Sequence, residues 1–300
     1  MDLDPIPTES ANLEAELEEV REERSRELSR PMRGAERDQL RRKYERLEAR
    51  IRERLAAIRG DPAPAEEAPT PTAHQTAETS IFDEQAARYD AWYDTPAGAA
   101  AFAEEVGALQ PMLAGLPRPW LEVGVGTGRF ARALGVEFGV DPAPGALRLA
   151  LPRGIEVAAA RGEALPFRNG TFGAVLLVVT LCFVADPLAT LLEARRVLRR
   201  DGGVVLGLVL AEGPLGVEYR AKAAEGHPYY REAHFFTRGE LASLLTSADL
   251  QAVRTRSALL VSPELSSTGI EPSRDPPRDG DDPRAGFTAI LSFAARGPDA

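Results

Sequence analysis

Short apolar runs alternate with helical patterns from about residue 81 to the end of the chain. The first run ends at Val123, in front of a glycine-rich turn, and further β-rich runs follow. Strands that alternate with helices are typical of a mostly parallel sheet with helices on both faces. The sequence therefore predicts an α/β domain with a doubly wound sheet. The later predicted strands are 136–140, 155–160, 174–179, 204–210, 251–261 and 286–295.

The first sixty residues carry a different pattern, in which Glu and Arg dominate. Within residues 36–59, apolar positions recur three and four apart, which places them on one face of a helix. The other positions are mostly charged, as on the outside of a coiled coil. We expect a helical, coiled-coil-like appendage over 1–60 that associates with itself, with a partner protein or as a hairpin; a charged single helix is the alternative. The apolar stripe is Leu40, Tyr44, Leu47, Ile51, Leu55 and Ile58.

Two segments lack the composition of a packed core. Residues 61–80 alternate Pro with Ala, Glu and Thr, which predicts a flexible linker. Residues 262–285 are rich in Pro, Asp and Arg, and we expect a low-order insertion there. The folded domain is therefore predicted over 81–298, with the insertion between its last two strands.

Three alternating glycines, Gly124, Gly126 and Gly128, stand where the first predicted strand turns into a helix. Glycine permits positive φ and leaves no Cβ between the backbone and a ligand. A tight turn without a ligand is the alternative, but glycines weaken a helix start unless something approaches them closely. The dinucleotide-binding fingerprint would have its third glycine at the position of Arg129. The loop therefore favours a small ligand other than a dinucleotide. This argues against a nicotinamide-dependent oxidoreductase, which is one rival hypothesis for the function.

Further motifs follow the loop. Asp141 ends the second predicted strand, about twenty residues after the first strand begins, where α/β nucleotide folds place an acid for ribose hydroxyls. Glu-Ala-Leu-Pro-Phe at 163–167, Asp-Pro at 186–187 and Arg-Val-Leu-Arg-Arg-Asp-Gly-Gly at 196–203 come next. Together with the acid-x-Gly-x-Gly-x-Gly loop, this order resembles class I S-adenosylmethionine (SAM)-dependent methyltransferases of the small-molecule type, which include methyltransferase type 11 and quinone-biosynthesis enzymes. The resemblance covers roughly residues 81–261 and resumes in the last strand.

The resemblance implies a Rossmann-like sheet of seven strands, the last of them antiparallel. It implies a transferase that moves a methyl group from SAM to an unidentified, small-molecule acceptor. A SAM-binding regulatory or assembly protein without methyl transfer is the alternative, because fold alone does not establish function.

The same resemblance implies which residues bind SAM. The loop contributes Glu122 and the three glycines, and Asp141 binds the ribose. Asp141 could also serve as a helix N-cap, and both roles could hold together. The family often has an acid where this chain has Arg161, and arginine cannot accept a hydrogen bond from the adenine amino group. Adenine recognition is then expected from Glu163 or from the backbone around Gly162.

Two more positions bear on this site. Thr180 follows the fourth strand at its carboxyl end, where open α/β sheets bind ligands. The family often has Asp where this chain has Gly173, which we expect to be a minor structural change.

Aromatic segments are expected on the acceptor side. Residues 87–94 resemble the family's cap helix, which closes over SAM and substrate, and residues 227–236 resemble the region that covers the acceptor. Candidates for a general base are His227, Tyr229, Tyr230 and His234, although such residues are more often packed and hydrogen-bonded than catalytic. The tetrapeptide [Asn/Asp]-Pro-Pro-[Tyr/Phe] is absent, which favours oxygen, carbon, sulfur or simple amine acceptors.

Composition narrows the class of partners. A net charge of −10 argues against non-specific binding to nucleic acid. The single Cys182 suits a reducing compartment, no apolar run is long enough to span a membrane, and no secretory signal is evident, so we expect a cytoplasmic protein. The histidines and the cysteine lack metal-ligand spacing, so no metal site is expected.

Overall fold

The computed structural model describes residues 17–18, 20–22, 24–26, 81–260 and 276–294. The chain divides into two compact units, 1–77 and 78–300. In the first unit the described residues are helical, Leu17 and Val20 are buried, and Arg21 pairs with Glu18 at 3.0 Å. The predicted apolar stripe of 36–59 and the predicted linker of 61–80 lie outside the described residues.

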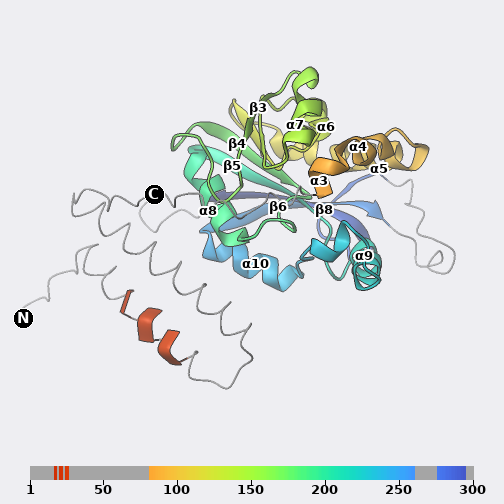
Figure 1. Ribbon diagram of the computed structural model, residues 1–300. Helices are drawn as coiled ribbons and strands as arrows, with labels where there is room; N and C mark the ends of the chain where they lie inside the picture. The colour runs from red at the N-terminus through yellow and green to blue at the C-terminus, as the bar shows by residue number, and fades with distance from the viewer. Residues whose placement is uncertain (1–16, 19, 23, 27–80, 261–275, 295–300) are drawn as a thin grey trace, which may run out of the picture. The chain divides into compact units, whose positions relative to one another are not determined.

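The second unit is built on one sheet (Figure 1), whose strands lie in the order β3-β2-β1-β4-β5-β8-β6-β7. The strands β1 to β5 pair in parallel, and β8 runs antiparallel between β5 and β6. The antiparallel last strand confirms that part of the prediction. The bounds are β1 Trp120–Val123, β2 Phe138–Asp141, β3 Glu156–Ala159, β4 Phe172–Val178, β5 Leu198–Leu208, β6 Leu250–Leu260, β7 Arg278–Asp279 and β8 Ala285–Ala294.

The expectation of seven strands was wrong, because the described residues form eight. The extra strand, β7, lies inside the segment 262–285 that was expected to be of low order. It pairs with Arg256 and Ser257 of β6. The Ser257 hydroxyl accepts a hydrogen bond from the Asp282 backbone N–H at 2.9 Å and donates one to the Gly280 carbonyl at 2.9 Å. Residues 278–282 are therefore attached to the sheet.

Helices cover both faces of the sheet. Successive residues of β4 face opposite sides, so Leu176 packs into one core and Leu177 into the other. Figure 1 shows α6 and α7 on one face and α8 and α10 on the other. The helices are α3 Ile81–Glu84, α4 Ala86–Trp92, α5 Pro96–Leu113, α6 Arg129–Leu134, α7 Pro144–Ala150, α8 Pro187–Val197, α9 Pro214–Ala224 and α10 Arg238–Ser247, with 3-10 turns at Leu151–Arg153 and Tyr230–Glu232.

Local sequence signals fix the starts of several helices. The Asp186 carboxylate accepts a hydrogen bond from the Ala189 N–H at 2.9 Å, and Pro187 occupies the first turn of α8. A capping box starts α10, in which the Thr237 and Glu240 side chains each accept a hydrogen bond from the other's backbone N–H. Such caps satisfy helix N–H groups that have no partner within the helix. Asp186 and Thr237 therefore mark the starts of α8 and α10.

Gly173 has a larger role than a minor change. A Cβ at this position of β4 would lie 1.8 Å from the carbonyl oxygen of Pro117. The Gly173 N–H also donates to the Pro119 carbonyl at 2.8 Å. The chain that enters β1 therefore passes so close to β4 that glycine is required here.

Candidate functional site

The loop after β1 uses each of its three glycines differently. All three have positive φ, at 74° for Gly124, 52° for Gly126 and 81° for Gly128. A Cβ on Gly124 would lie 2.3 Å from the Thr180 side chain, and one on Gly128 would lie 2.5 Å from Ile155. A Cβ on Gly126 would meet nothing within 4 Å. Two glycines therefore permit close packing, whereas Gly126 presents bare backbone to open space.

Glu122 is the third residue of β1 and precedes the first glycine of the loop by two residues. It is buried, and its Oε2 atom has no hydrogen-bond partner among the described residues. Burial raises the pKa of Glu122 well above its usual value. A hydrogen bond from the Ala131 backbone N–H lowers this pKa, and the nearby charge of Asp141 raises it further, so the net effect is a strong increase. A buried polar atom without a partner is uncommon in folded proteins and indicates a missing ligand or water.

Asp141 joins the end of β2 to the glycine loop. Its Oδ2 atom accepts from the Gly126 N–H and its Oδ1 atom from the Ala143 N–H, both at 2.9 Å. Burial raises its pKa, and those two bonds oppose the increase. The N-cap of α7 is Ala143, so the alternative role of Asp141 as helix N-cap is wrong. Asp141 holds the loop in place and keeps lone pairs for further donors.

Gly162 and Glu163 follow β3 near the ends of β1 and α8. A Cβ on Gly162 would lie 2.9 Å from Thr190 and 3.1 Å from Val123, so its backbone lies close to β1. The Oε1 atom of Glu163 accepts from the N–H groups of Ala185 and Asp186, at 2.9 and 3.2 Å. Its Oε2 atom lies 3.5 Å from Nε of Arg161. Both oxygens of Glu163 therefore already have partners within the protein.

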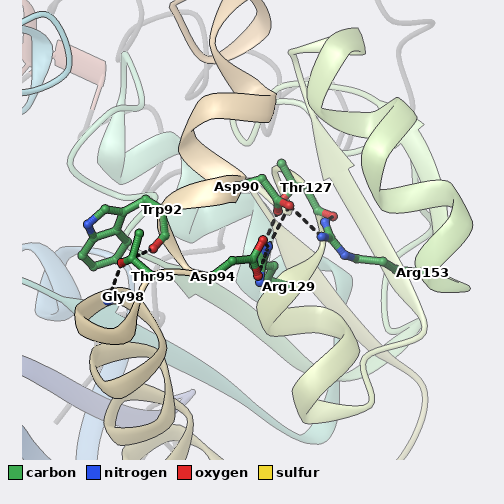
Figure 2. A network of polar contacts seen from close by, with 8 residues as sticks. All are labelled: Asp90, Trp92, Asp94, Thr95, Gly98, Thr127, Arg129 and Arg153. Atoms are coloured by element: carbon green, nitrogen blue, oxygen red, sulfur yellow. Dashed lines mark hydrogen bonds and ion pairs between the residues drawn. The ribbon is translucent and has the colours of Figure 1, made fainter.

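A network of charges attaches α4 to the glycine loop (Figure 2). Asp90 of α4 accepts a hydrogen bond from the Thr127 hydroxyl at 2.5 Å and from Arg129 at 2.8 and 2.9 Å. Arg153 reaches the same carboxylate at 2.8 Å. Asp94 contacts only Arg129 in the network that Figure 2 draws, at 2.9 Å. Helix α4 is thus attached directly to Thr127 in the loop and to Arg129 just after it.

Electrostatics favour the ionised form of Asp90. Its side chain is 15% exposed. Burial alone would raise the pKa of Asp90, but hydrogen bonds from Arg129, Arg153 and Thr127 outweigh burial and hold it well below the usual range. Sequence reasoning missed this network. Arg129 was visible as the residue in place of a third glycine, but nothing local to it indicated a partner on α4.

The four candidate bases do not all lie together. The ring of His227 stacks on Tyr230 at 4.4 Å, and Tyr230 stacks on Tyr219 of α9 at 4.2 Å. The Tyr229 hydroxyl donates to the Gln85 side chain at 2.9 Å. His234 is exposed, and its ring lies against Phe236 instead. Three candidates therefore share one aromatic region.

Two further observations concern the surroundings of His227 and Tyr229. The Nδ1 atom of His227 is buried without a hydrogen-bond partner in the described part of the chain. The Tyr229 ring lies 5.7 Å from Phe82 of α3 and 6.1 Å from Tyr89 of α4. The 227–236 segment therefore meets α3 and α4 through aromatic rings.

Metal-ligand groups and membrane-spanning helices are both absent from the described residues. Within them, no three His, Cys, Asp or Glu side chains gather as metal ligands. Among the same residues, no helix combines the length and apolar character needed to cross a membrane.

Comparison with known proteins gives one family model and several relatives. A family model described as a methyltransferase domain matches residues 121–206. Uncharacterized protein Rv2003c of Mycobacterium tuberculosis is 46% identical over 212 residues, which are 71% of this chain and 73% of that protein. Uncharacterized protein MJ1123 of Methanocaldococcus jannaschii is 32% identical over 58% of this chain and 83% of its own length.

Solved structures show the same fold. A Thermotoga maritima protein described as a "SAM-dependent methyltransferase, possible histamine N-methyltransferase" is 32% identical, with a TM-score of 0.62. The alignment covers 71% of this chain and 98% of that one. The CcbJ methyltransferase of Streptomyces caelestis is 18% identical with a TM-score of 0.51, covering 73% of this chain and 100% of that one, and this likeness concerns the fold alone.

Proposed function

Because this chain belongs to the class I SAM-dependent methyltransferases, we propose that it transfers a methyl group from SAM to a small-molecule acceptor. Two observations at the end of β1 carry the proposal: Gly126 presents open backbone in the loop, and Glu122, four residues earlier in the chain, has a buried oxygen without a partner among the described residues. The family model and the solved relatives are methyltransferases, so they lend no support to a nicotinamide-dependent oxidoreductase.

The residues at the loop fit SAM in chemistry. Gly126 allows a ligand to touch the backbone, and the free Glu122 oxygen suits a donor such as an ammonium group or a bound water. Asp141 is held in place by two backbone N–H groups and can accept from the ribose hydroxyls. We expect Gly124 and Gly128 to support SAM binding indirectly, since they let Thr180 and Ile155 pack against the loop.

Adenine recognition is assigned to the backbone around Gly162. The oxygens of Glu163 are engaged with Ala185, Asp186 and Arg161, which leaves it poorly placed to change partners. Gly162 lies against Val123 at the end of β1, and its peptide groups need no side chain to hydrogen-bond a base. Thr180 stays a predicted neighbour of the ligand through its contact with Gly124.

SAM supplies an activated methyl group, so the protein needs no covalent nucleophile. The work left to the chain is alignment of donor and acceptor and exclusion of water. Asp90 and its arginine partners hold α4 against the loop, where this helix can cover the bound ligand. If a base removes a proton from the acceptor, His227 suits that role best, because its Nδ1 atom has no described partner.

The test is calorimetry of SAM and of NAD on the full chain and on matched variants. Gly126→Val should abolish measurable SAM binding, because a branched side chain would fill the space over the loop. Asp141→Ala should weaken SAM binding by about 10-fold to about 100-fold, the value of one charged hydrogen bond.

Gly115→Val is the matched control. Gly115 has φ +84° and, like Gly126, has open space around its Cβ position, but it follows α5 rather than β1. The Gly115→Val variant should lose about as much stability as Gly126→Val and should keep the SAM affinity of the parent chain. Full SAM affinity in folded Gly126→Val, or tight binding of NAD by the parent chain, would overturn the proposal. Tight SAM binding without transfer to any acceptor would favour a SAM-binding regulator.

A further inference from the structure

One ring nitrogen of His227 lies outside the SAM-binding loop and has no partner. His227 comes shortly after α9, and its Nδ1 atom is buried without a hydrogen-bond partner among the described residues. The backbone around it is fixed, because its N–H donates to the Lys222 carbonyl at 3.0 Å and its carbonyl accepts from the Arg231 N–H at 3.1 Å. A buried polar atom that stays unpaired is unfavourable, so Nδ1 points to a missing donor.

Two tyrosine rings hold the His227 ring in place. Tyr219, Tyr230 and His227 form a stack, in which neighbouring ring centroids lie 4.2 and 4.4 Å apart at interplanar angles of 11° and 21°. Tyr219 belongs to α9, and Tyr230 belongs to the 3-10 turn that follows. If the imidazole turned out of this plane toward another partner, the stack would be broken. The unpaired nitrogen is therefore held where it is.

A row of aromatic rings connects His227 with the end of β4. The Phe183 ring lies 4.9 Å from the Phe82 ring. The Tyr229 ring lies 5.7 Å from Phe82 and 6.0 Å from His227. The Phe183 N–H donates to the carbonyl of Thr180 at 2.9 Å, and Thr180 lies against the glycine loop. We call the rings of Phe183, Phe82, Tyr229 and His227 the aromatic row, which begins beside a ligand on that loop.

Hydrogen bonds attach the segment that carries His227 to two neighbouring elements. The His234 N–H donates to the Cys182 carbonyl, just after β4, at 2.8 Å. The Tyr229 hydroxyl donates to the side chain of Gln85, which precedes α4, at 2.9 Å. Both elements adjoin the glycine loop, α4 through Asp90 and the end of β4 through its contact with Gly124. The aromatic row is therefore part of the same site as the loop.

The charged side chains next to His227 already have partners. Lys222 pairs with Glu218, and Arg231 pairs with Glu232 at 3.0 Å. A charged ligand would lose hydration at the row without gaining a counter-charge from these two pairs. The row itself offers ring faces and one nitrogen, which accepts a hydrogen bond in the neutral imidazole. These features favour a neutral ligand.

Two features of a ligand are complementary to this arrangement. An aromatic ring packs on the row through offset or edge contacts, which add to the effect of the buried area. An O–H or N–H group on that ring supplies the donor that Nδ1 lacks. A saturated ring would lack the first feature, and a hydrocarbon ring would lack the second.

We propose that the aromatic row binds the methyl acceptor, which is therefore a neutral aromatic molecule with an O–H or N–H group on its ring. The proposal rests on the methyltransferase function proposed above and names its acceptor class. The ring of the acceptor packs on Phe82 and Tyr229, and its O–H or N–H group donates to Nδ1 of His227. The oxygen or nitrogen of that group receives the methyl group.

The transfer step then balances. A lone pair on the oxygen or nitrogen forms the bond to the methyl carbon, and the carbon–sulfur bond breaks with its electron pair remaining on sulfur. The proton on the same oxygen or nitrogen passes to Nδ1 of His227, so the methylated acceptor leaves without charge. The imidazolium formed in this way returns its proton to water.

The test compares 4-methylphenol and 4-methylaniline with p-xylene, which has no donor, and with 4-methylcyclohexanol, which has no aromatic ring. Each is titrated calorimetrically into the full chain saturated with S-adenosylhomocysteine, and the two aromatic donors are offered as acceptors with SAM. The better-bound donor identifies the reacting atom as oxygen or nitrogen.

We expect this donor probe to bind about 5-fold to about 100-fold more tightly than p-xylene, because p-xylene leaves Nδ1 unpaired. It should exceed 4-methylcyclohexanol by at least about 2-fold, because a saturated ring lacks the aromatic contacts. Equal affinity for p-xylene or for 4-methylcyclohexanol, or no measurable binding of either donor, would overturn the inference.

Variants separate the hydrogen bond from the fold. His227→Phe keeps a ring in the stack and removes Nδ1, so it should lower the affinity for the donor probe to that for p-xylene. The affinities for p-xylene and S-adenosylhomocysteine should stay unchanged, which a general loosening of the site would not produce. His234→Phe is the matched control, since His234 is exposed and its ring lies against Phe236. An unchanged affinity for the donor probe in His227→Phe would overturn the inference and leave a bound water as the partner of Nδ1.

A second pair of variants tests the ring faces. Tyr229→Leu should remove the preference for the donor probe over 4-methylcyclohexanol, because it takes one ring out of the row. Tyr229→Phe keeps that ring and should keep the preference. A preference that is unchanged in Tyr229→Leu would overturn the placement of the acceptor on the row.

The experiment also distinguishes the two proposals. Failure of the parent chain to bind SAM or S-adenosylhomocysteine would refute the methyltransferase function, whatever the probes do. Normal SAM binding with transfer to aliphatic or charged acceptors, and none to aromatic donors, would refute only the inference about the aromatic acceptor.

Discussion

At the scale of single residues, burial acts on acids in two opposite ways. Glu105 and Glu122 are buried without cations, and their pKa values rise. Asp90 is also largely buried, but two arginines and a threonine hydroxyl lower its pKa. The first two groups therefore favour the protonated form, whereas Asp90 is ionised, already has its partners and acts as a structural link.

Glu105 should make stability depend on pH. Its folded pKa of about 8 lies above the value near 4.3 of an unfolded glutamate. Its contribution is therefore fully present below about pH 4 and is lost as pH rises through about 8. Glu105→Gln should match the parent near pH 5 and exceed it near pH 9, by up to about 4 kcal/mol.

Urea unfolding of both chains between pH 5 and pH 9 measures this difference. Glu104 also raises the pKa of Glu105, and Glu105 raises the pKa values of Tyr89, Tyr93 and Tyr219. All four of these residues are the same in both chains. Glu104→Gln, treated identically, shows the effect of removing a carboxylate whose oxygen has a backbone donor. A stability difference that stays constant with pH would contradict the prediction.

At the scale of elements, α4 is held to the loop by charges as well as by apolar packing. Asp90 bonds Thr127, Arg129 and Arg153, while Tyr93 packs on Phe102 and Phe130. A helix of seven residues is too short to be stable alone, so its order depends on these contacts. Changes at Asp90 should therefore loosen the whole element.

Asp90→Asn should lower stability by about 1–3 kcal/mol, because it removes a charged acceptor from two arginines. It should also raise amide hydrogen exchange in 86–95 and increase the rate of SAM dissociation. Asp94→Asn is the control, since Asp94 is 69% exposed and pairs with Arg129 alone among the ion pairs of this region; exposed pairs contribute about 0–1 kcal/mol. Equal exchange in the two variants would contradict the role of Asp90.

The sequence predicted those elements whose signals are local. The turn from the first strand into a helix at the three glycines and the antiparallel last strand were both predicted correctly. Asp90 was missed because its partner Arg153 is 63 residues away, and only the fold brings the two together. β7 was missed because a two-residue strand, Arg278–Asp279, carries no apolar alternation.

At the scale of the whole molecule, the chain divides at residues 77 and 78 into two compact units. The sheet, both of its cores and the candidate site all belong to the second unit. The domain bounds expected from the sequence, 1–60, 61–80 and 81–298, stay predictions.

A chain that begins at Glu78 should fold and bind SAM with the affinity of the full chain. Its cores and its sheet are formed entirely by residues after 78. Circular dichroism during urea unfolding and SAM calorimetry check this outcome. Loss of a cooperative transition would show that the first 77 residues contribute to the fold.

The first unit is predicted to associate through the stripe that includes Leu47 and Ile51. Burial of apolar area stabilises association by about 25 cal/mol per Å², whereas an isolated helix of this length is marginal in water. Sedimentation of the full chain beside Leu47→Glu/Ile51→Glu should show a larger species for the parent. A monomeric parent at tens of micromolar would leave a partner protein or a hairpin as the occupant of the stripe.

The short strand β7 has a consequence for how copies of this protein behave at high concentration. An uncovered strand at the edge of a sheet offers backbone groups to another chain and invites aggregation. β7 takes up the backbone groups of β6 at Arg256 and Ser257. Asp279 pairs with Arg254 at 3.1 Å and with Arg256 at 2.8 Å, which places charges along the same edge. A segment with the composition of a loop thereby protects this part of the β6 edge from intermolecular strand addition.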